Sequence, residues 1–226
     1  MNDSRAFAQE KIAGSHKREF WIKENQKHLP AHYRLQKCGR IISRIAGGGQ
    51  CELLDVGCGP ATLMSVLPEN IHYFGIDIAI HDPAPNLLES DILETPIMFG
   101  EKKFDIVVAQ GLFEYVGVHQ SEKFGEIAEV LRENGILVLT YTNFNHRAKQ
   151  IFEAFSNVQP PGDFRKDLAR HFTIDRSFPA SHNWYGGQPS RAVVKAVNMR
   201  LNANVPLISP RLAVEYFFIC RPRRRG

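Results

Sequence analysis

The chain has 226 residues, of which 43% are hydrophobic and 23% charged, with a formal net charge of +4; these values exclude a disordered or fibrous protein and fit one globular domain. A chain of this length buries enough surface to fold without disulfide bonds or a structural metal. No apolar run approaches the roughly 18 residues of a membrane span, and charges stand where a secretory signal has its apolar segment, so we expect a cytoplasmic protein without a membrane partner.

Residues 1–46 are predicted to be helical, because their apolar residues recur at helical spacing. Pro30 interrupts this region, and a second helix is predicted from Ala31 to Ile45. The glycine run that starts at Gly47 ends it. We expect these helices to form a lid over the rest of the domain.

Residues 50–145 alternate between short apolar runs and helical patterns. Helices are predicted at 61–67 and 124–132, the second stopped by Asn134-Gly135, whereas two prolines reduce the segment 79–85 to a loop. Such alternation predicts an α/β fold with a doubly wound, Rossmann-like and mostly parallel sheet. The five expected strands are 51–57, 71–77, 86–91, 104–110 and 136–142.

Residues 146–226 are predicted to complete the sheet. The pattern indicates helices at 146–155 and 190–201 and strands at 172–178 and 212–220, the last strand antiparallel. A segment from about 182 to 210 is expected as an insertion on the substrate side. No linker or repeat divides the chain, so residues 1–226 are expected to form a single domain.

The most informative segment is a glycine turn after the first strand. Gly57 and Gly59 allow close backbone approach to a ligand, and the helix N-terminus that follows offers N–H groups to a carboxylate. Asp55 can face a cation, and Asp77, at the end of the second strand, can accept hydrogen bonds from ribose hydroxyls. Together they suit an adenosine ligand with ammonium, carboxylate and sulfonium groups.

A nicotinamide fingerprint, G-x-G-x-x-G, is the competing interpretation. Thr62 replaces its last glycine, and the charge of Asp55 would repel a diphosphate. A nicotinamide oxidoreductase is therefore the residual alternative.

Five motifs occur in family order: DVGCGP at 55–60, IDI at 76–78, DILETP at 91–96, FDIVVAQGLFEYV at 104–116 and LRENGILVLT at 131–140. They resemble those of class I S-adenosylmethionine (SAM)-dependent methyltransferases over roughly residues 50–145. The resemblance implies an enzyme with SAM as its cofactor and S-adenosylhomocysteine as its product.

The resemblance also implies roles for the matching positions. Asp55 and the turn Gly57-Cys58-Gly59 would hold the methionine end of SAM, with the family's third glycine replaced by Ala61. The remaining cofactor contacts would be Asp77 on the ribose, Ile78 on the adenine, Asp91 and Ile92 at the adenine amino group, and Gln110 near the methionine. Tyr33 and Arg34 are expected to reach the SAM carboxylate from the preceding helix.

Methyl transfer needs a base only if the acceptor loses a proton. We select Glu114 and His146 as the catalytic candidates. The other groups considered are Tyr115, His119, Tyr141, Asn143, His171, His182 and Tyr185.

The sequence also narrows the acceptor. Gln110-Gly111-Leu112-Phe113 replaces the Asn/Asp-Pro-Pro-Tyr motif of enzymes that methylate exocyclic base or amide nitrogens. Gln110 also stands where catechol-type enzymes carry a metal-binding Asp, so we expect no metal. The leading hypothesis is a small-molecule methyltransferase, O- or C-directed, in a biosynthetic pathway.

Three alternatives stay open. An arginine cluster at Arg221 and 223–225 allows an RNA methyltransferase, although a solvated tail explains it as well. The chain could also bind SAM without methyl transfer, or use SAM to polarise a substrate in a rearrangement. A homodimer is likewise left open.

Overall fold

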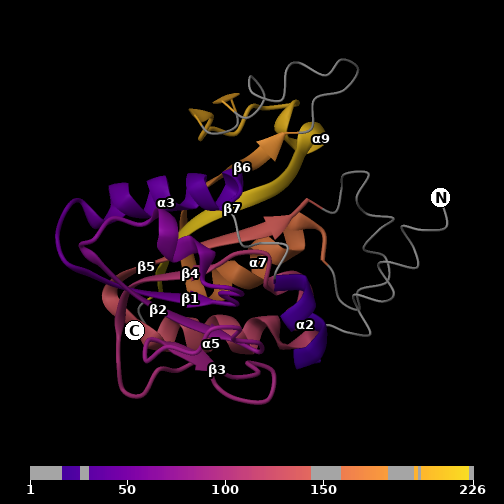
Figure 1. Ribbon diagram of the computed structural model, residues 1–226. Coiled ribbons are helices and arrows are strands. Elements are labelled where there is room, and N and C mark those ends of the chain that lie inside the picture. The colour runs from indigo at the N-terminus through magenta and orange to yellow at the C-terminus, as the bar shows by residue number, and fades with distance from the viewer. Residues whose placement is uncertain (1–16, 26–30, 144–158, 183–195, 198–199, 224–226) are drawn as a thin grey trace.

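Figure 1 presents a computed structural model of the chain, in which residues 17–25, 31–143, 159–182, 196–197 and 200–223 are described. One seven-stranded sheet has the order β3-β2-β1-β4-β5-β7-β6. Its strands are β1 Cys51–Val56, β2 Ile71–Asp77, β3 Leu87–Glu89, β4 Phe104–Ala109, β5 Leu131–Thr142, β6 Phe172–His182 and β7 Ala213–Pro222.

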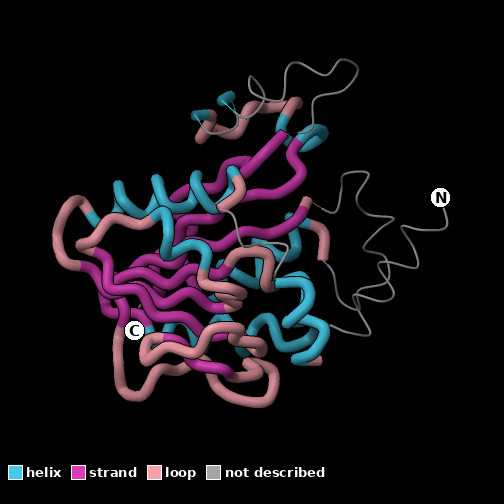
Figure 2. Tube along the Cα trace, viewed as in Figure 1, coloured by secondary structure: helices cyan, strands magenta, loops and turns pink. Residues whose placement is uncertain are grey.

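Helices cover both faces of this sheet (Figures 1 and 2). Helix α3 packs on one face, where Ile42 belongs to the same core cluster as Leu53 of β1, and α5 and α7 pack on the other, where Phe124 and Phe164 belong to the core. The described helical elements are α2 Arg18–Asn25, α3 Tyr33–Ala46, η2 Thr62–Val66, α4 Phe113–Val116, η3 Gly117–His119, α5 Gln120–Val130, α7 Pro161–His171 and α9 Ser209–Leu212.

The predicted strand directions are confirmed. β1 to β5 pair in parallel, and β7 runs antiparallel to both β5 and β6. The central strands β1 and β4 are buried on both faces, which explains their nearly continuous apolar sequences. The doubly wound, Rossmann-like class follows from this sheet and its two helical layers.

Several predicted elements differ from the structure in type or bounds, including α5, which starts at Gln120, and β6, which continues to His182. The helix after the glycine turn is the short 3₁₀ segment η2, and α5 ends at Val130 rather than Arg132. Leu131 is already extended and pairs with Phe104, after which the register shifts to Ile106 beside Ile136. The bulge between these pairs accommodates the turn residues 134–135, which the sequence pattern had assigned to a helix stop.

The prolines after β2 have the expected effect, because residues 78–86 contain no helix. At the N-terminus, the second predicted helix corresponds to α3, and α2 is tied to β3 by Arg18, whose Nε lies 2.7 Å from Glu89 Oε1. The helix predicted at 146–155 lies outside the described residues, as does most of that predicted at 190–201.

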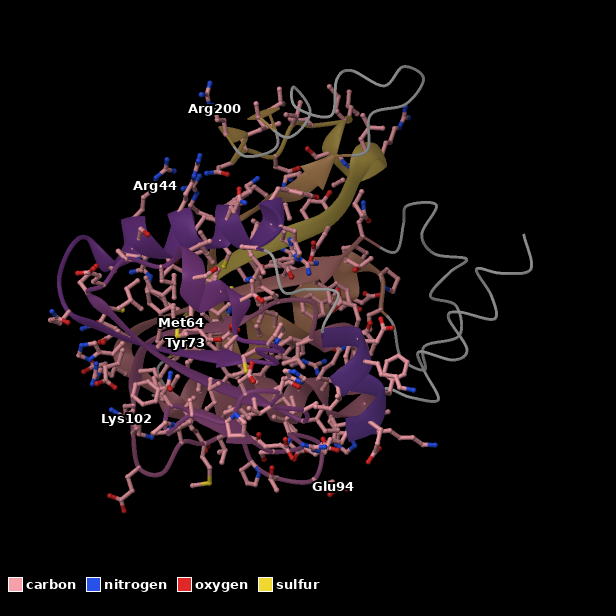
Figure 3. All side chains as sticks on the ribbon, viewed as in Figure 1. Arg44, Met64, Tyr73, Glu94, Lys102 and Arg200 are labelled. Carbon is pink, nitrogen blue, oxygen red and sulfur yellow. The ribbon has the colours of Figure 1, made fainter. Side chains whose placement is uncertain are left out.

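Side chains divide as expected between surface and interior. Arg44 on α3 and Glu94 after β3 are exposed at the periphery, whereas Tyr73 of β2 is buried and lies between them in the view of Figure 3. The buried apolar residues of the described ranges form two core clusters, and both include residues of the sheet.

Gly75 in β2 offers a test of this packing. A Cβ at this position would lie 2.8 Å from Cys58 Sγ and 2.9 Å from Leu87 Cδ2. We expect Gly75→Ala to lower the free energy of unfolding by about 1–3 kcal/mol, measured by urea denaturation. Gly162 of α7, where a Cβ meets nothing within 4 Å, is the matched control. An equal loss in Gly162→Ala would contradict the packing argument.

Candidate active site

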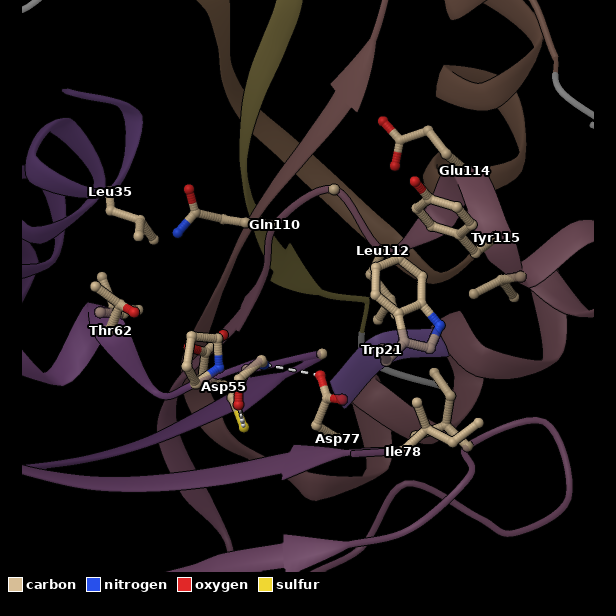
Figure 4. A pocket seen from close by; sticks show the side chains of 18 of the residues that line it. Trp21, Leu35, Asp55, Thr62, Asp77, Ile78, Gln110, Leu112, Glu114 and Tyr115 are labelled. Carbon is tan, nitrogen blue, oxygen red and sulfur yellow. Dashed lines mark hydrogen bonds between the residues drawn. The ribbon is translucent and has the colours of Figure 1, made fainter. Parts of the chain in front are cut away.

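A cavity of about 330 Å³ opens at the carboxyl ends of β1, β2, β4 and β5 (Figure 4). Its volume lies at the lower end of the range of small-molecule sites, roughly 300–1,000 Å³. Ligands of doubly wound sheets bind at this edge. The cavity lining includes the predicted cofactor residues Asp55, Gly57, Cys58, Gly59, Asp77, Ile78, Asp91, Ile92 and Gln110.

The glycine turn is held in a left-handed conformation. The φ angles of Gly57, Gly59 and Ala61 are 74°, 54° and 53°. Gly57 N and Cys58 N donate to Ile76 O at 2.8 and 3.1 Å, which fixes the turn against β2. Ala61 adopts the same backbone region as the glycines, at a cost of about 1 kcal/mol for a residue with a Cβ. The replacement of the third glycine therefore preserves the turn.

Asp55 lies buried at the floor of the cavity, at the end of β1. Its Oδ2 accepts a hydrogen bond from the Tyr73 hydroxyl at 2.8 Å. Burial raises the pKa of Asp55 to about 7, with a further contribution from the charge of Asp77 and an opposing one from the Tyr73 hydroxyl. A ligand cation beside this carboxyl would favour its ionised form.

Asp77 holds the turn in place. It also lies where the sequence predicts a contact to the ribose. Its Oδ2 accepts from Gly59 N at 2.8 Å and its Oδ1 from Ala79 N at 2.9 Å (Figure 4). A carboxylate oxygen accepts two hydrogen bonds, so hydroxyl groups of a ligand can share these oxygens with the backbone. Asp91, after β3, similarly accepts from Leu93 N at 2.9 Å.

Three side chains in the cavity hold polar atoms with no partner among the described residues, and one of these atoms is Nε of Arg34. Both amide atoms of Gln110 and Oε2 of Glu114 are buried and unsatisfied. The other oxygen of Glu114, Oε1, accepts from Thr142 N at 2.8 Å and Thr142 Oγ1 at 2.9 Å. Buried polar groups are rarely left unpaired, which indicates that a ligand supplies the missing partners.

Glu114 is the one of the two catalytic candidates that the structure places in the cavity. It is 5% exposed, and burial raises its pKa to about 7, assisted by the charge of Glu215. His146 lies outside the described residues. Of the other histidines considered, His119 pairs with Glu122 and His171 with Ser121; neither lines the cavity.

Arg34, rather than Tyr33, faces the cavity from α3. Successive helix positions point about 100° apart, so only one of these neighbours can face inward. Arg34 Nη1 lies 3.0 Å from both carboxylate oxygens of Glu215 in β7. Sequence reasoning missed Glu215, because its partner is 181 positions away and no local pattern marks it.

The described part of the chain contains no group of three or more His, Cys, Asp or Glu side chains placed to hold a metal ion. Within the same ranges, no helix has both the length and the apolar character needed to cross a bilayer.

The two buried carboxyl groups lead to a prediction about pH. In the folded protein Asp55 and Glu114 keep protons to about pH 7, whereas the unfolded chain releases them near pH 4. The folded state therefore binds more protons in this window, and stability falls as pH rises from about 4 to 7, by up to about 1.4 kcal/mol per pH unit for each group. Urea unfolding at pH 5, 6 and 7 measures this fall.

The double variant Asp55→Asn, Glu114→Gln is the comparison for this experiment. Its free energy of unfolding is expected not to show the decrease between pH 5 and pH 7 that the two carboxyl groups cause. A fall of the same size in the double variant would contradict the assignment.

Comparison with known proteins places these features in a family. The model of a methyltransferase domain matches residues 30–178, more than half of the chain. A search of curated proteins found no match.

Similar folds occur among solved structures, all at low identity. A chain from a complex with a methyltransferase activator of Haloferax volcanii has a TM-score of 0.64 at 12% identity, covering 92% of this chain and 96% of that one. A SAM-dependent methyltransferase of Archaeoglobus fulgidus has a TM-score of 0.60 at 16% identity, and the match covers 84% of this chain and 94% of that one. A TehB-like SAM-dependent methyltransferase of Corynebacterium glutamicum has a TM-score of 0.56 at 14% identity, and the match covers 98% of this chain and 99% of that one.

The cavity fits the cofactor that this family uses. The left-handed glycine turn lets the backbone approach a ligand closely, carboxyl groups end β1 and β2, and the unsatisfied amide of Gln110 needs a ligand partner. Domain match, fold and site agree, and the chain belongs to the class I SAM-dependent methyltransferases.

Proposed function

We propose that this enzyme transfers the methyl group of SAM to a small molecule bound in the same cavity, without the help of a metal ion. The observation that carries the proposal is the unsatisfied Oε2 of Glu114, which lines the cavity beyond the glycine turn. A donor on the acceptor would satisfy this oxygen, and the same oxygen could then take a proton.

The chain's own residues divide the work of binding. Asp55 would pair with the ammonium group, the glycine turn would lie against the methionine end because it has no bulky side chains, and Asp77 would accept from the ribose hydroxyls. Ile78 and Ile92 supply apolar surface for the adenine, with Asp91 at its amino group. SAM supplies an activated methyl group on a sulfonium.

The acceptor side is formed by α2, α3 and α4. Trp21 of α2 meets the ring of Tyr115 edge to face, with centroids 5.2 Å apart. Both rings line the cavity, where they would exclude water from the transfer. In this proposal α2 is the part of the predicted N-terminal lid that closes over the acceptor.

The other predictions from the sequence have less support. In the described part of the arginine cluster, Arg221 pairs with Asp175 at 2.6 Å and Arg223 Nε donates to Phe172 O at 3.3 Å, and these contacts do not favour RNA as the acceptor; residues 224–225 lie outside the described residues. The oxygen or carbon acceptor, the biosynthetic role, the cytoplasmic location and the homodimer stay predictions.

A transfer assay tests the proposed function. The protein is incubated with SAM carrying an isotopically labelled methyl group, together with either a small-molecule metabolite extract or total RNA, with and without EDTA. We expect label in the small-molecule fraction that EDTA does not reduce. Label confined to RNA, label lost with EDTA, or no transfer at all would contradict the proposal.

A further inference from the structure

At the acceptor end of the cavity, only one oxygen of the Glu114 carboxyl group has a hydrogen-bond partner among the described residues. Thr142 donates two hydrogen bonds to Glu114 Oε1, and Oε2, buried in the same carboxyl group, has no partner there. Asp55, at the other end of the site, already serves the ammonium group of the cofactor in the proposed function. The unsatisfied Oε2 therefore calls for a hydrogen-bond donor on the acceptor.

The charges around Glu114 narrow the kind of donor. Arg34 is the nearby cation, and Glu215 engages it at 3.0 Å through both carboxylate oxygens. That pair has no net charge, although Arg34 Nε is itself buried without a partner among the described residues, so the ionised Glu114 adds a negative charge. His32 is the other basic side chain among the described lining residues. An acceptor with positive charge would complement this end, and one with negative charge would be repelled.

Aromatic rings stand beside the same carboxyl group. Tyr115 is the chain neighbour of Glu114 and lines the cavity, and the Trp21 ring is set at 88° to the Tyr115 ring (Figure 4). Aromatic faces attract ammonium groups, and the attraction grows where water is excluded. A carboxyl group next to two aromatic rings is a combination suited to a cationic amine.

We propose that the acceptor is a small primary or secondary amine, whose nitrogen donates a hydrogen bond to Glu114 Oε2 and receives the methyl group. This inference rests on the proposed function and replaces the oxygen or carbon acceptor expected from the sequence. Trp21 and Tyr115 contact the apolar part of the amine. Arg34 and Glu215 keep each other neutral at the same end.

The transfer balances when both protons of the amine are counted. The ammonium form that the carboxylate attracts first releases one proton to solvent, and the neutral nitrogen then uses its lone pair to form the bond to the methyl carbon. The carbon–sulfur bond breaks and its electrons stay on sulfur, which gives S-adenosylhomocysteine. The methylated nitrogen then loses its proton to Glu114 Oε2, so the products are the N-methylated amine, S-adenosylhomocysteine and a protonated Glu114.

Three probes of similar size separate charge from shape: benzylamine, benzyl alcohol and benzoate. Each is titrated calorimetrically at pH 8 into protein saturated with S-adenosylhomocysteine, so that binding is read without turnover. We expect benzylamine to bind about tenfold more tightly than benzyl alcohol, and benzoate to bind least, because a charge-assisted hydrogen bond is the stronger one.

Two variants assign the preference to Glu114. Glu114→Gln keeps the shape of the side chain and is expected to bind benzylamine and benzyl alcohol with affinities within about threefold of each other, since the charge is gone. Glu122→Gln makes the same replacement on the exposed surface of α5 and should keep the tenfold preference. Melting temperatures with S-adenosylhomocysteine confirm that each variant folds.

Several results overturn the inference. They are equal binding of benzylamine and benzyl alcohol, tightest binding of benzoate, no binding of benzylamine, or a preference that survives in Glu114→Gln. With SAM in place of its product, mass spectrometry should find N-methylbenzylamine and no benzyl methyl ether. If S-adenosylhomocysteine itself fails to bind, the proposed function fails as well, whereas its binding without an amine preference overturns the amine alone.

Discussion

An Asp77→Ala variant is expected to bind S-adenosylhomocysteine about 100-fold or more weakly than the original protein, since hydrogen bonds to a charged group contribute about 1.5–3 kcal/mol each. The carboxylate has two tasks. It fixes Gly59 N and Ala79 N at 2.8 and 2.9 Å, and in the proposed function it accepts from two ribose hydroxyls. Losing it removes ligand contacts and loosens the turn that carries the others.

Calorimetric titration measures this loss, because the product binds without reacting. Asp82→Ala, an exposed carboxylate five positions along the same loop, is the matched control and should bind normally. Urea unfolding of Asp77→Ala separates a folded protein with a weak site from an unfolded one. A folded Asp77→Ala variant with unchanged affinity would rule out the ribose assignment.

Glu114→Gln is expected to lower kcat by about 10²–10⁴, the usual contribution of a positioned proton acceptor. The amide can still accept from Thr142 N and Thr142 Oγ1 but cannot take a proton. The rate in the original protein should rise near pH 7 as Glu114 ionises, in addition to the rise at higher pH that an amine shows as it loses its own proton, and only the rise near pH 7 should be absent in the variant. The assay uses either benzylamine or benzyl alcohol, depending on which of the two the original protein methylates faster.

Affinity for S-adenosylhomocysteine provides the control for this rate effect. It should change less than about threefold in Glu114→Gln, since the contacts to the cofactor come from other side chains. Glu122→Gln should keep both rate and affinity. If Glu114→Gln transfers methyl groups at the original rate, Glu114 is not the proton acceptor.

The parts of the site that the sequence predicted are those carried by short, local segments. The glycine turn and Asp77 lie at strand ends, and both strands are continuous apolar runs that alternate with turn residues. The prolines at 83 and 85 likewise act on their own backbone, so the loop after β2 was predictable. Local sequence sets these features because few distant contacts compete with it.

The parts that the sequence did not predict depend on tertiary contacts. Both Tyr33 and Arg34 were expected to reach the ligand, but only Arg34 lines the cavity, because the rotation of α3 on the sheet selects it and Glu215 of β7 holds it there. The start of β5 at Leu131 depends on its pairing with Phe104. Neither contact leaves a pattern in the nearby sequence, since the partners are far apart in the chain.

Calorimetric titration of the protein with SAM, S-adenosylhomocysteine and NAD tests whether the chain binds the cofactor of its family. We expect SAM and S-adenosylhomocysteine to bind with micromolar Kd values, which correspond to a binding free energy of about −8 kcal/mol, and we expect NAD not to bind. The reason is that Asp55 suits an ammonium group and repels a diphosphate. Binding of NAD, or no binding of either SAM or its product, would contradict the account.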